Sequence, residues 1–186
     1  MKKFFIVAGS LVGVVVLLIV GMMAVMFFLS SSNNAYKGDY TNVLKSTAPA
    51  TKKALVVFQP SRSKEFAKIT DQLAKGLGES GYEVTVSYPG KHLSADVKDY
   101  SVLAFGSPIY IGQPSTALTD YMKQIKDFSN KKVIAFSIGS MEAAPEFEIF
   151  KTNLSGGKIY KQIKFIAKDK SDEDKAYKLG LEVGKE

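Results

Sequence analysis

The chain divides into one long apolar run and a longer region in which short apolar runs alternate with amphipathic ones. Residues 4–29 form a run of 26 residues without a charge, and Ser10 is their only polar side chain. At a rise of about 1.5 Å per residue, a helix of that length exceeds the roughly 30 Å hydrocarbon core of a bilayer. The pattern therefore predicts one transmembrane helix, which forms a membrane anchor at residues 1–29.

Two lysines, Lys2 and Lys3, precede this run and resemble the charged start of a signal peptide, so cleavage is the alternative to an anchor. The run is longer than the roughly 7–15 apolar residues of a signal peptide and no A-x-A cleavage site follows it, which favours the anchor. Lys37 and Lys45 lie further from the run on its other side. The positive-inside bias therefore favours a single-pass protein of the cell membrane with an extracytoplasmic soluble domain.

Beyond the anchor, residues 30–53 are rich in Ser, Asn, Thr and Lys and show no sustained periodicity, which predicts a flexible linker. Residues 54–186 are enough for one compact domain. In them, short β-branched runs alternate with segments of helical period, which indicates an α/β domain with a parallel sheet. We expect strands at residues 54–58, 82–86, 101–105 and 133–137 and within residues 159–167.

Helices are expected between and after these strands. Apolar residues recur at helical spacing after Ser63, which we interpret as an N-cap. Further helices are expected from Pro114, over residues 142–154 and from Ser171. In the helix expected over residues 142–154, Glu142, Glu146 and Glu148 are interpreted as a solvated face.

Composition removes several classes of function. The chain has no cysteine and one histidine, His92, which excludes disulfide scaffolds, thiolate metal sites and histidine-rich metal sites. No nucleotide-binding glycine motif or G-x-S-x-G occurs, so His92 is interpreted as a surface residue and not as a hydrolase base. The strand ends lack the carboxylates of a phosphorylated receiver domain. With a net charge of +7, the lysines of residues 158–170 favour anionic lipid over nucleic acid, because no nucleic-acid-binding motif accompanies them.

Three loops at strand ends carry the candidate chemistry, because ligands of parallel α/β sheets bind beyond the carboxyl ends of the strands. The first, residues 59–64, brings two serines and two basic residues to a helix N-terminus, a typical anion site; the alternative is that the serines only cap the helix. The second, residues 106–115, is unusually apolar, and Tyr110 either stacks on a planar ligand or packs internally. The third, residues 138–143, offers Gly139 and Ser140 for close backbone approach.

One segment carries a specific resemblance. Residues 100–125, with Gly106-Ser107-Pro108-Ile109-Tyr110 and Gly112-Gln113-Pro114-Ser115, resemble the third strand, ring-binding loop and following helix of the flavodoxin-like family. The resemblance implies a doubly wound five-stranded parallel sheet of order 2-1-3-4-5 and non-covalent FMN. It also implies electron transfer to or from a redox partner protein or a quinone-like acceptor, as an electron-transfer flavoprotein or an NAD(P)H-dependent FMN reductase-like enzyme. The predicted anchor would place a membrane-associated partner within reach.

The resemblance also implies which residues hold FMN, and no side chain is needed as a catalytic acid or base. It assigns the phosphate to Ser61, Arg62, Ser63 and Lys64, one side of the ring to Pro108, Ile109, Tyr110, Ile111 and Gly112, and the second ring-contacting loop to Gly139, Ser140 and Met141. The phosphate loop lacks the family's glycine, no tryptophan is present, and the domain is basic where electron-carrying flavodoxins are usually acidic. A flavodoxin-like binding or scaffolding module that has lost FMN is therefore the alternative.

Overall fold

The computed structural model describes residues 2–46 and 52–185, and of residues 2–11 only the backbone. Five helices and six strands are found in the described ranges. The helices are α1 (Lys2–Asn34), α2 (Glu65–Glu79), α3 (Thr116–Gln124), α4 (Glu146–Thr152) and α5 (Asp172–Lys185). The strands are β1 (Thr41–Leu44), β2 (Lys52–Phe58), β3 (Tyr82–Ser87), β4 (Val102–Pro108), β5 (Lys132–Gly139) and β6 (Ile159–Ile166).

The strands form one mixed sheet of order β1-β3-β2-β4-β5-β6. The pairs from β3 to β6 are all parallel, so the five predicted strands adopt the predicted order. Strand β1 adds an antiparallel edge, with Thr41 opposite Ser87 and Leu44 opposite Val84. The prediction of a flexible linker over residues 30–53 is therefore wrong for residues 30–34, which continue α1, and for residues 41–44 and 52–53, which lie in strands β1 and β2. Residues 47–51 of that segment lie outside the described residues.

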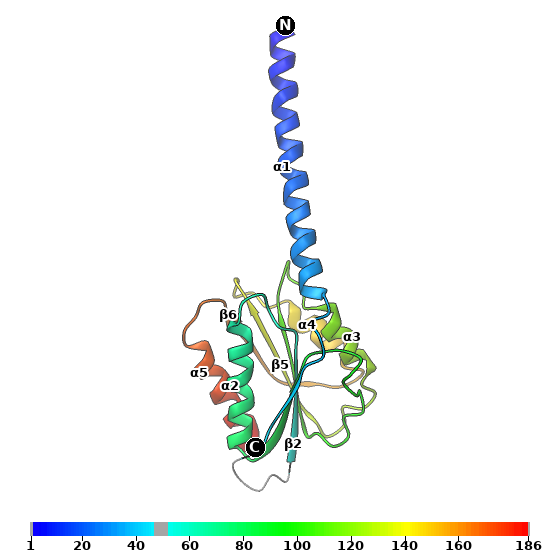
Figure 1. The fold of residues 1–186 in the computed structure, drawn as a ribbon, viewed down its shortest axis with the longest axis vertical. Helices are drawn as coiled ribbons and strands as arrows, with labels where there is room; N and C mark the ends of the chain where they lie inside the picture. Colours follow the sequence, from blue (N-terminus) through cyan, green and yellow to red (C-terminus); the bar gives the residue numbers. More distant parts are fainter. Residues whose placement is uncertain (1, 47–51, 186) are drawn as a thin grey trace.

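Helices cover both faces of the sheet (Figure 1). Alternation along β2 sends Val56 and Phe58 to the face covered by α2 and α5, and Leu55 and Val57 to the face covered by α3 and α4. The central strands β2 and β4 have buried residues on both faces, as their continuous apolar runs predict. The domain therefore has one core on each side of the sheet.

Helices α2 and α5 meet through glycine. A Cβ atom at Gly76 would lie 2.3 Å from the carbonyl oxygen of Tyr177, and one at Gly180 would lie 2.4 Å from that of Leu73. Real Cβ atoms do not approach backbone oxygens so closely, so only glycine permits this helix–helix distance. The two helices thus form a layer whose spacing depends on two missing side chains.

Helix α1 projects from the end of the domain opposite the C-terminus (Figure 1). Within the described residues, Val12–Asn34 is the one stretch long and apolar enough to cross a membrane, a test that a signal sequence also passes. Its last turn touches the domain, since Asn33 is 5% exposed and its carbonyl oxygen accepts hydrogen bonds from Gln59 Nε2 (2.7 Å) and Ser115 Oγ (3.1 Å). Gln59 follows β2 and Ser115 precedes α3, so α1 ends at the carboxyl edge of the sheet.

Candidate functional site

The loop after β2 leads into α2 without a side-chain cap. Ser61 Oγ donates to the carbonyl oxygen of Ser63 at 2.6 Å and lies 3.3 Å from Ser63 Oγ. Helix α2 begins at Glu65, and its N-cap residue is Lys64, which makes no capping hydrogen bond through its side chain. The prediction of Ser63 as N-cap is therefore wrong. The first turn of α2 keeps N–H groups that an anion can accept from, next to two serine hydroxyls.

The loop after β4 is closed by a tight turn. Tyr110 and Gln113 exchange two backbone hydrogen bonds of 3.2 and 3.0 Å, and Ile111 and Gly112 between them have φ values of 55° and 71°. Positive φ at both central residues is typical of a type I′ turn, in which a β-branched residue is strained. The turn exposes Ile111, whereas Ser107 at its base is buried and accepts a hydrogen bond from the Ser115 amide at 2.8 Å.

The loop after β5 rests on a buried ion pair. Lys164 Nζ lies 2.9 Å from Glu146 Oε1, and Ser137 Oγ donates to the same oxygen at 2.7 Å. Glu146 is fully buried, so its interpretation as part of a solvated face is wrong. Lys164 also donates to the carbonyl oxygen of Ala143, which ties residues 139–143 to β6.

These three loops enclose a cavity of about 250 Å³ at the carboxyl edge of the sheet. The Ile109 amide donates to the carbonyl oxygen of Ile138 at 2.8 Å, which joins the second and third loops at the cavity. The cavity is lined by Ser61, Ser63, Glu65, Pro108, Ile109, Tyr110, Ile138, Gly139, Ser140 and Ala167. Its volume lies just below the roughly 300–1,000 Å³ of typical ligand pockets, so a ligand with a large ring must extend beyond it.

Comparisons with known proteins find similarity in fold but none in sequence to a family model or a curated protein. The sequence matches no protein-family model and no curated protein. Solved structures do match: a flavodoxin from the domain Archaea has 16% identity and a TM-score of 0.58, over 71% of this chain and 96% of that one. This chain has the flavodoxin-like fold. The Megasphaera elsdenii flavodoxin, solved in its two-electron reduced state, has 13% identity to this chain and a TM-score of 0.60, over 72% of this chain and 99% of that one. Rubredoxin oxygen:oxidoreductase from Desulfovibrio gigas has 16% identity to this chain and a TM-score of 0.61, over 73% of this chain but only 36% of that one.

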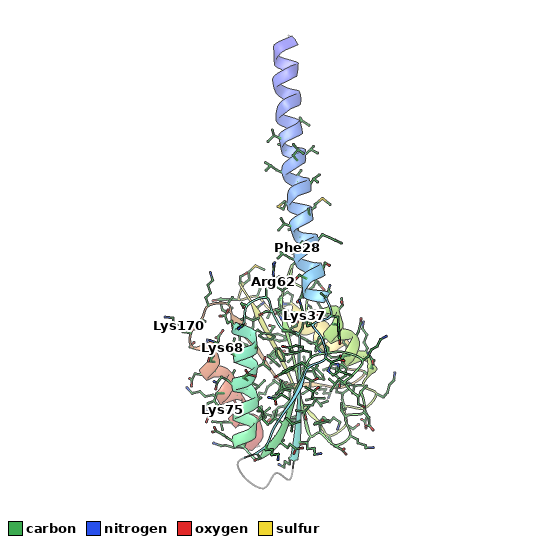
Figure 2. All side chains as sticks on the ribbon, in the orientation of Figure 1. Phe28, Lys37, Arg62, Lys68, Lys75 and Lys170 are labelled. Atoms are coloured by element: carbon green, nitrogen blue, oxygen red, sulfur yellow. The ribbon has the colours of Figure 1, made fainter. Side chains whose placement is uncertain are left out.

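In this flavodoxin-like fold, seven of the twelve residues assigned to FMN line the cavity, two in the first loop, three in the second and two in the third. Five assigned residues lie outside its lining: Arg62, Lys64, Ile111, Gly112 and Met141. Arg62 turns towards α1, with its guanidinium carbon 5.2 Å from the ring centroid of Phe28 (Figure 2). Met141 is 66% exposed. The structure thus brings the three assigned loops together at one cavity, but not every assigned residue lines it.

Three residues of the cavity lining are not among those assigned to FMN: Glu65, Ala167 and Ile138, of which Ile138 lies within the third candidate loop. Glu65 Oε1 accepts a hydrogen bond from the Lys168 amide at 2.6 Å, which links the start of α2 to the end of β6. A carboxylate at the first turn of a helix is favoured by the helix dipole. Its place directly after the serine loop was visible in the sequence, but the contact across 103 residues was not.

A second, larger cavity of about 670 Å³ lies between residues 34–39, the loop after β3 and α3. His92 and Asp39 line it, and His92 Nδ1 lies 2.8 Å from Asp39 Oδ1, while Nε2 lies 3.2 Å from Ser87 Oγ. This order of groups resembles a hydrolase triad. However, Ser87 is fully buried and donates to the carbonyl oxygen of Tyr40 at 2.8 Å, so its hydroxyl is closed to a substrate. The contacts therefore fasten residues 39–40 to the sheet, which agrees with the exclusion of a hydrolase.

Proposed function

We propose that this protein is a membrane-anchored FMN-binding protein that transfers electrons to or from a membrane-associated partner. The observation that carries the proposal is the cavity at the carboxyl edge, which joins two serine hydroxyls and an uncapped helix N-terminus to the loops after β4 and β5. The fold supports it, because flavodoxins are among the solved structures that match. The flavin would supply the redox chemistry, by accepting and releasing electrons.

The residues present fit this group in two respects. Ser61 and Ser63, with the first amides of α2, would hold the phosphate, because hydroxyl and amide hydrogens near a helix N-terminus favour an anion. Ile109 and Tyr110 on one side and Gly139 and Ser140 on the other would bracket the ring. The exposed Ile111 would cover the part of the ring that extends beyond the cavity. The chain itself binds and orients; it need not move a proton.

The test is a titration of the full chain, in detergent or nanodiscs, with FMN and with riboflavin, which lacks the phosphate. We expect FMN to bind with a micromolar or lower Kd. Replacing Ser61 and Ser63 by Ala should weaken FMN binding by about a hundredfold, since each of the two lost hydrogen bonds to a charged group costs roughly 1.5 kcal/mol, and should leave riboflavin binding nearly unchanged. The matched control is Ser129→Ala with Ser155→Ala, two exposed serines that line another cavity. Equal losses for both flavins contradict the phosphate role.

The second candidate is a flavodoxin-like binding module without FMN. Two observations favour it: Arg62 turns away from the cavity, and the Glu65 carboxylate lines the space proposed for the phosphate. A folded chain that binds neither flavin at micromolar concentration would establish this function instead. If FMN binds, oxidation of NAD(P)H by the loaded protein separates a reductase from a carrier.

The anchor is proposed on the apolar surface of α1. Described side chains from Val12 to Phe28 are exposed, which water does not favour over so large an area. We propose that α1 is uncleaved and spans the membrane, and that the domain that follows it, which begins with β1, is a soluble domain on the extracytoplasmic side. Retention in the membrane fraction after alkaline carbonate washing tests the span, and protease accessibility in intact cells tests the side.

A further inference from the structure

We propose that the carboxyl edge of the sheet rests on the membrane surface and that Arg62 binds anionic lipid headgroups there. The inference rests on the proposed span of α1 but not on FMN. It concerns the orientation of the domain relative to the membrane, which a flexible linker would not fix.

The first step is the attachment of α1 to the domain. Besides the two hydrogen bonds to the Asn33 carbonyl oxygen, Asn34 Oδ1 accepts one from the Thr116 amide at 2.9 Å. Thr116 is the first residue of α3, so a side chain of α1 caps another helix. Gln59 also donates to the carbonyl oxygen of Ala35 at 3.1 Å. Four hydrogen bonds thus join the end of α1 to two elements of the domain.

The second step is distance. Helix α1 is continuous to Asn34, and Leu29 is the last residue of its apolar run. Asn33 follows Leu29 by four residues, or about 6 Å along the helix axis. The headgroup region adds roughly 5–8 Å on each side of the hydrocarbon core. With Leu29 at the boundary of the hydrocarbon core, the carboxyl edge therefore lies at the level of the headgroups.

The third step is Arg62 itself. It is exposed, and its guanidinium lies against Phe28, inside the apolar run (Figure 2). Within the described part of the chain, Arg62 has no carboxylate within 4.0 Å, so its charge is free for another partner. A guanidinium binds phosphate in a bidentate manner, and Arg beside an aromatic ring is suited to the headgroup layer. The geometry therefore assigns Arg62 to a lipid phosphate.

Neighbouring charges agree with this partner. Exposed lysines follow Arg62 and the end of β6, at Lys64, Lys168 and Lys170, and Lys170 lies at the same end of the domain as Arg62 (Figure 2). Of the carboxylates there, Asp169 is paired with Lys175 at 2.7 Å. Basic residues next to a transmembrane helix are attracted to anionic lipid, and this attraction falls off within about a Debye length.

The test uses the full chain in nanodiscs of phosphatidylcholine with or without phosphatidylglycerol. Because the chain has no cysteine, Met141→Cys and Ser129→Cys each give one site for a fluorophore. Met141 follows β5 and Ser129 precedes it, so the eight residues of β5 separate them by about 26 Å. We expect lipids with a spin label on the headgroup to quench the Met141 label at least threefold more than the Ser129 label. Equal quenching in a protein that resists carbonate extraction overturns the inference.

The lipid partner is tested by charge. We expect phosphatidylglycerol to increase quenching at Met141, and Arg62→Gln to abolish that increase. The matched control is Lys75→Gln, because Lys75 also lies over an aromatic ring, 5.5 Å from the centroid of Tyr177, but at the other end of α2 (Figure 2). An unchanged increase in Arg62→Gln overturns the role of Arg62. Release of the protein by carbonate would instead refute the span, a failure of the proposed function.

Discussion

The first and last helices of the chain differ in whether the domain buries their apolar side chains. Helix α5 buries Ala176, Leu179 and Val183 against the domain, and its charged residues other than Asp172 lie outside. Helix α1 is apolar all round, and in its described part Gly13 and Gly21 have nothing within 4 Å of an added Cβ. In α5, by contrast, Gly180 lies against α2. Glycine therefore permits a close helix–helix contact in α5, whereas in the described part of α1 it lies on a surface that contacts nothing in the domain.

The comparison shows that an amphipathic pattern indicates what the helix packs against, whereas a uniformly apolar pattern does not. A stripe of apolar residues at helical spacing has to meet the core of its own chain. A helix without a polar face has no such stripe to direct it to the core of its own domain, and the proposed span of α1 would place its apolar surface in lipid. Four predictions test this difference, from the largest expected effect to the smallest.

The largest effect is expected from charges in the middle of α1. Val16→Arg together with Leu17→Arg should cost about 5–7 kcal/mol of membrane insertion, at roughly 2.5–3.5 kcal/mol for each arginine at a helix centre. The fraction of full chain retained after carbonate washing measures this. The control pair, Ser31→Arg with Ala35→Arg, adds the same charge at exposed positions beyond the apolar run. Retention of the first pair at the control's level would mean that α1 is not a span.

A smaller loss is expected at the glycine contact of α5. Gly180→Ala should lower the free energy of unfolding by about 2–3 kcal/mol, because its Cβ would meet the Leu73 carbonyl oxygen at 2.4 Å and force the helices apart. Urea unfolding of the full chain in detergent, followed by circular dichroism, measures the change.

Two further glycines serve as controls for this substitution. At Gly78 in α2 an added Cβ would have nothing within 4 Å, so Gly78→Ala should stabilise the protein by up to about 1 kcal/mol through helix propensity. Gly13→Ala in α1 should leave the unfolding of the domain unchanged. If Gly180→Ala behaves like Gly78→Ala, the close contact between α2 and α5 is refuted.

The junction between α1 and the domain should respond more weakly. Gln59→Leu removes the two hydrogen bonds to Asn33 and Ala35, at a cost of about 1 kcal/mol. Hydrogen exchange of the Thr116 amide, which Asn34 protects, should become roughly fivefold faster as the helix end detaches. Gln124→Leu is the control, because the Gln124 side chain donates to the carbonyl oxygen of Asp120 within α3. Unchanged exchange at Thr116 would show that Gln59 does not hold α1.

The smallest effect concerns the start of α5, which has the acidic first turn that α1 lacks. Hydrogen bonds from Lys175 and Ser171 hold the pKa of Asp169 well below its usual value of 3.8. The stability that this carboxylate contributes is therefore present above about pH 4 and is lost as pH falls towards the lowered pKa. Asp169→Asn should flatten the fall in the urea midpoint between pH 4 and pH 2.

Asp71 in α2 provides a contrast of opposite sign. Burial raises the pKa of Asp71, so its contribution to stability increases as pH falls through the raised value. Asp71→Asn should therefore stabilise the protein at neutral pH, where Asp169→Asn should not. Parallel pH profiles for the two variants would contradict both assignments.

Much of the fold was predictable because local patterns report local surroundings. The continuous apolar runs at residues 54–58 and 101–105 became strands buried on both faces, and the segment at residues 100–125 indicated the family whose strand order the sheet adopts. The short polar strand β1 was not predicted. Its exposed edge position requires no apolar pattern, and its pairing with β3 is visible only in space.

The sequence by itself determined an apolar helix, alternating strands and helices, and three loops at one edge of a parallel sheet, because each follows from the period of apolar residues along the chain. Only the tertiary structure decided where the polar side chains of that edge point. Arg62 meets Phe28 of a helix 34 residues earlier, and Glu146 is buried against Lys164 of the next strand. Such charges have no periodicity to reveal them, because their positions depend on which distant group compensates them once water is excluded.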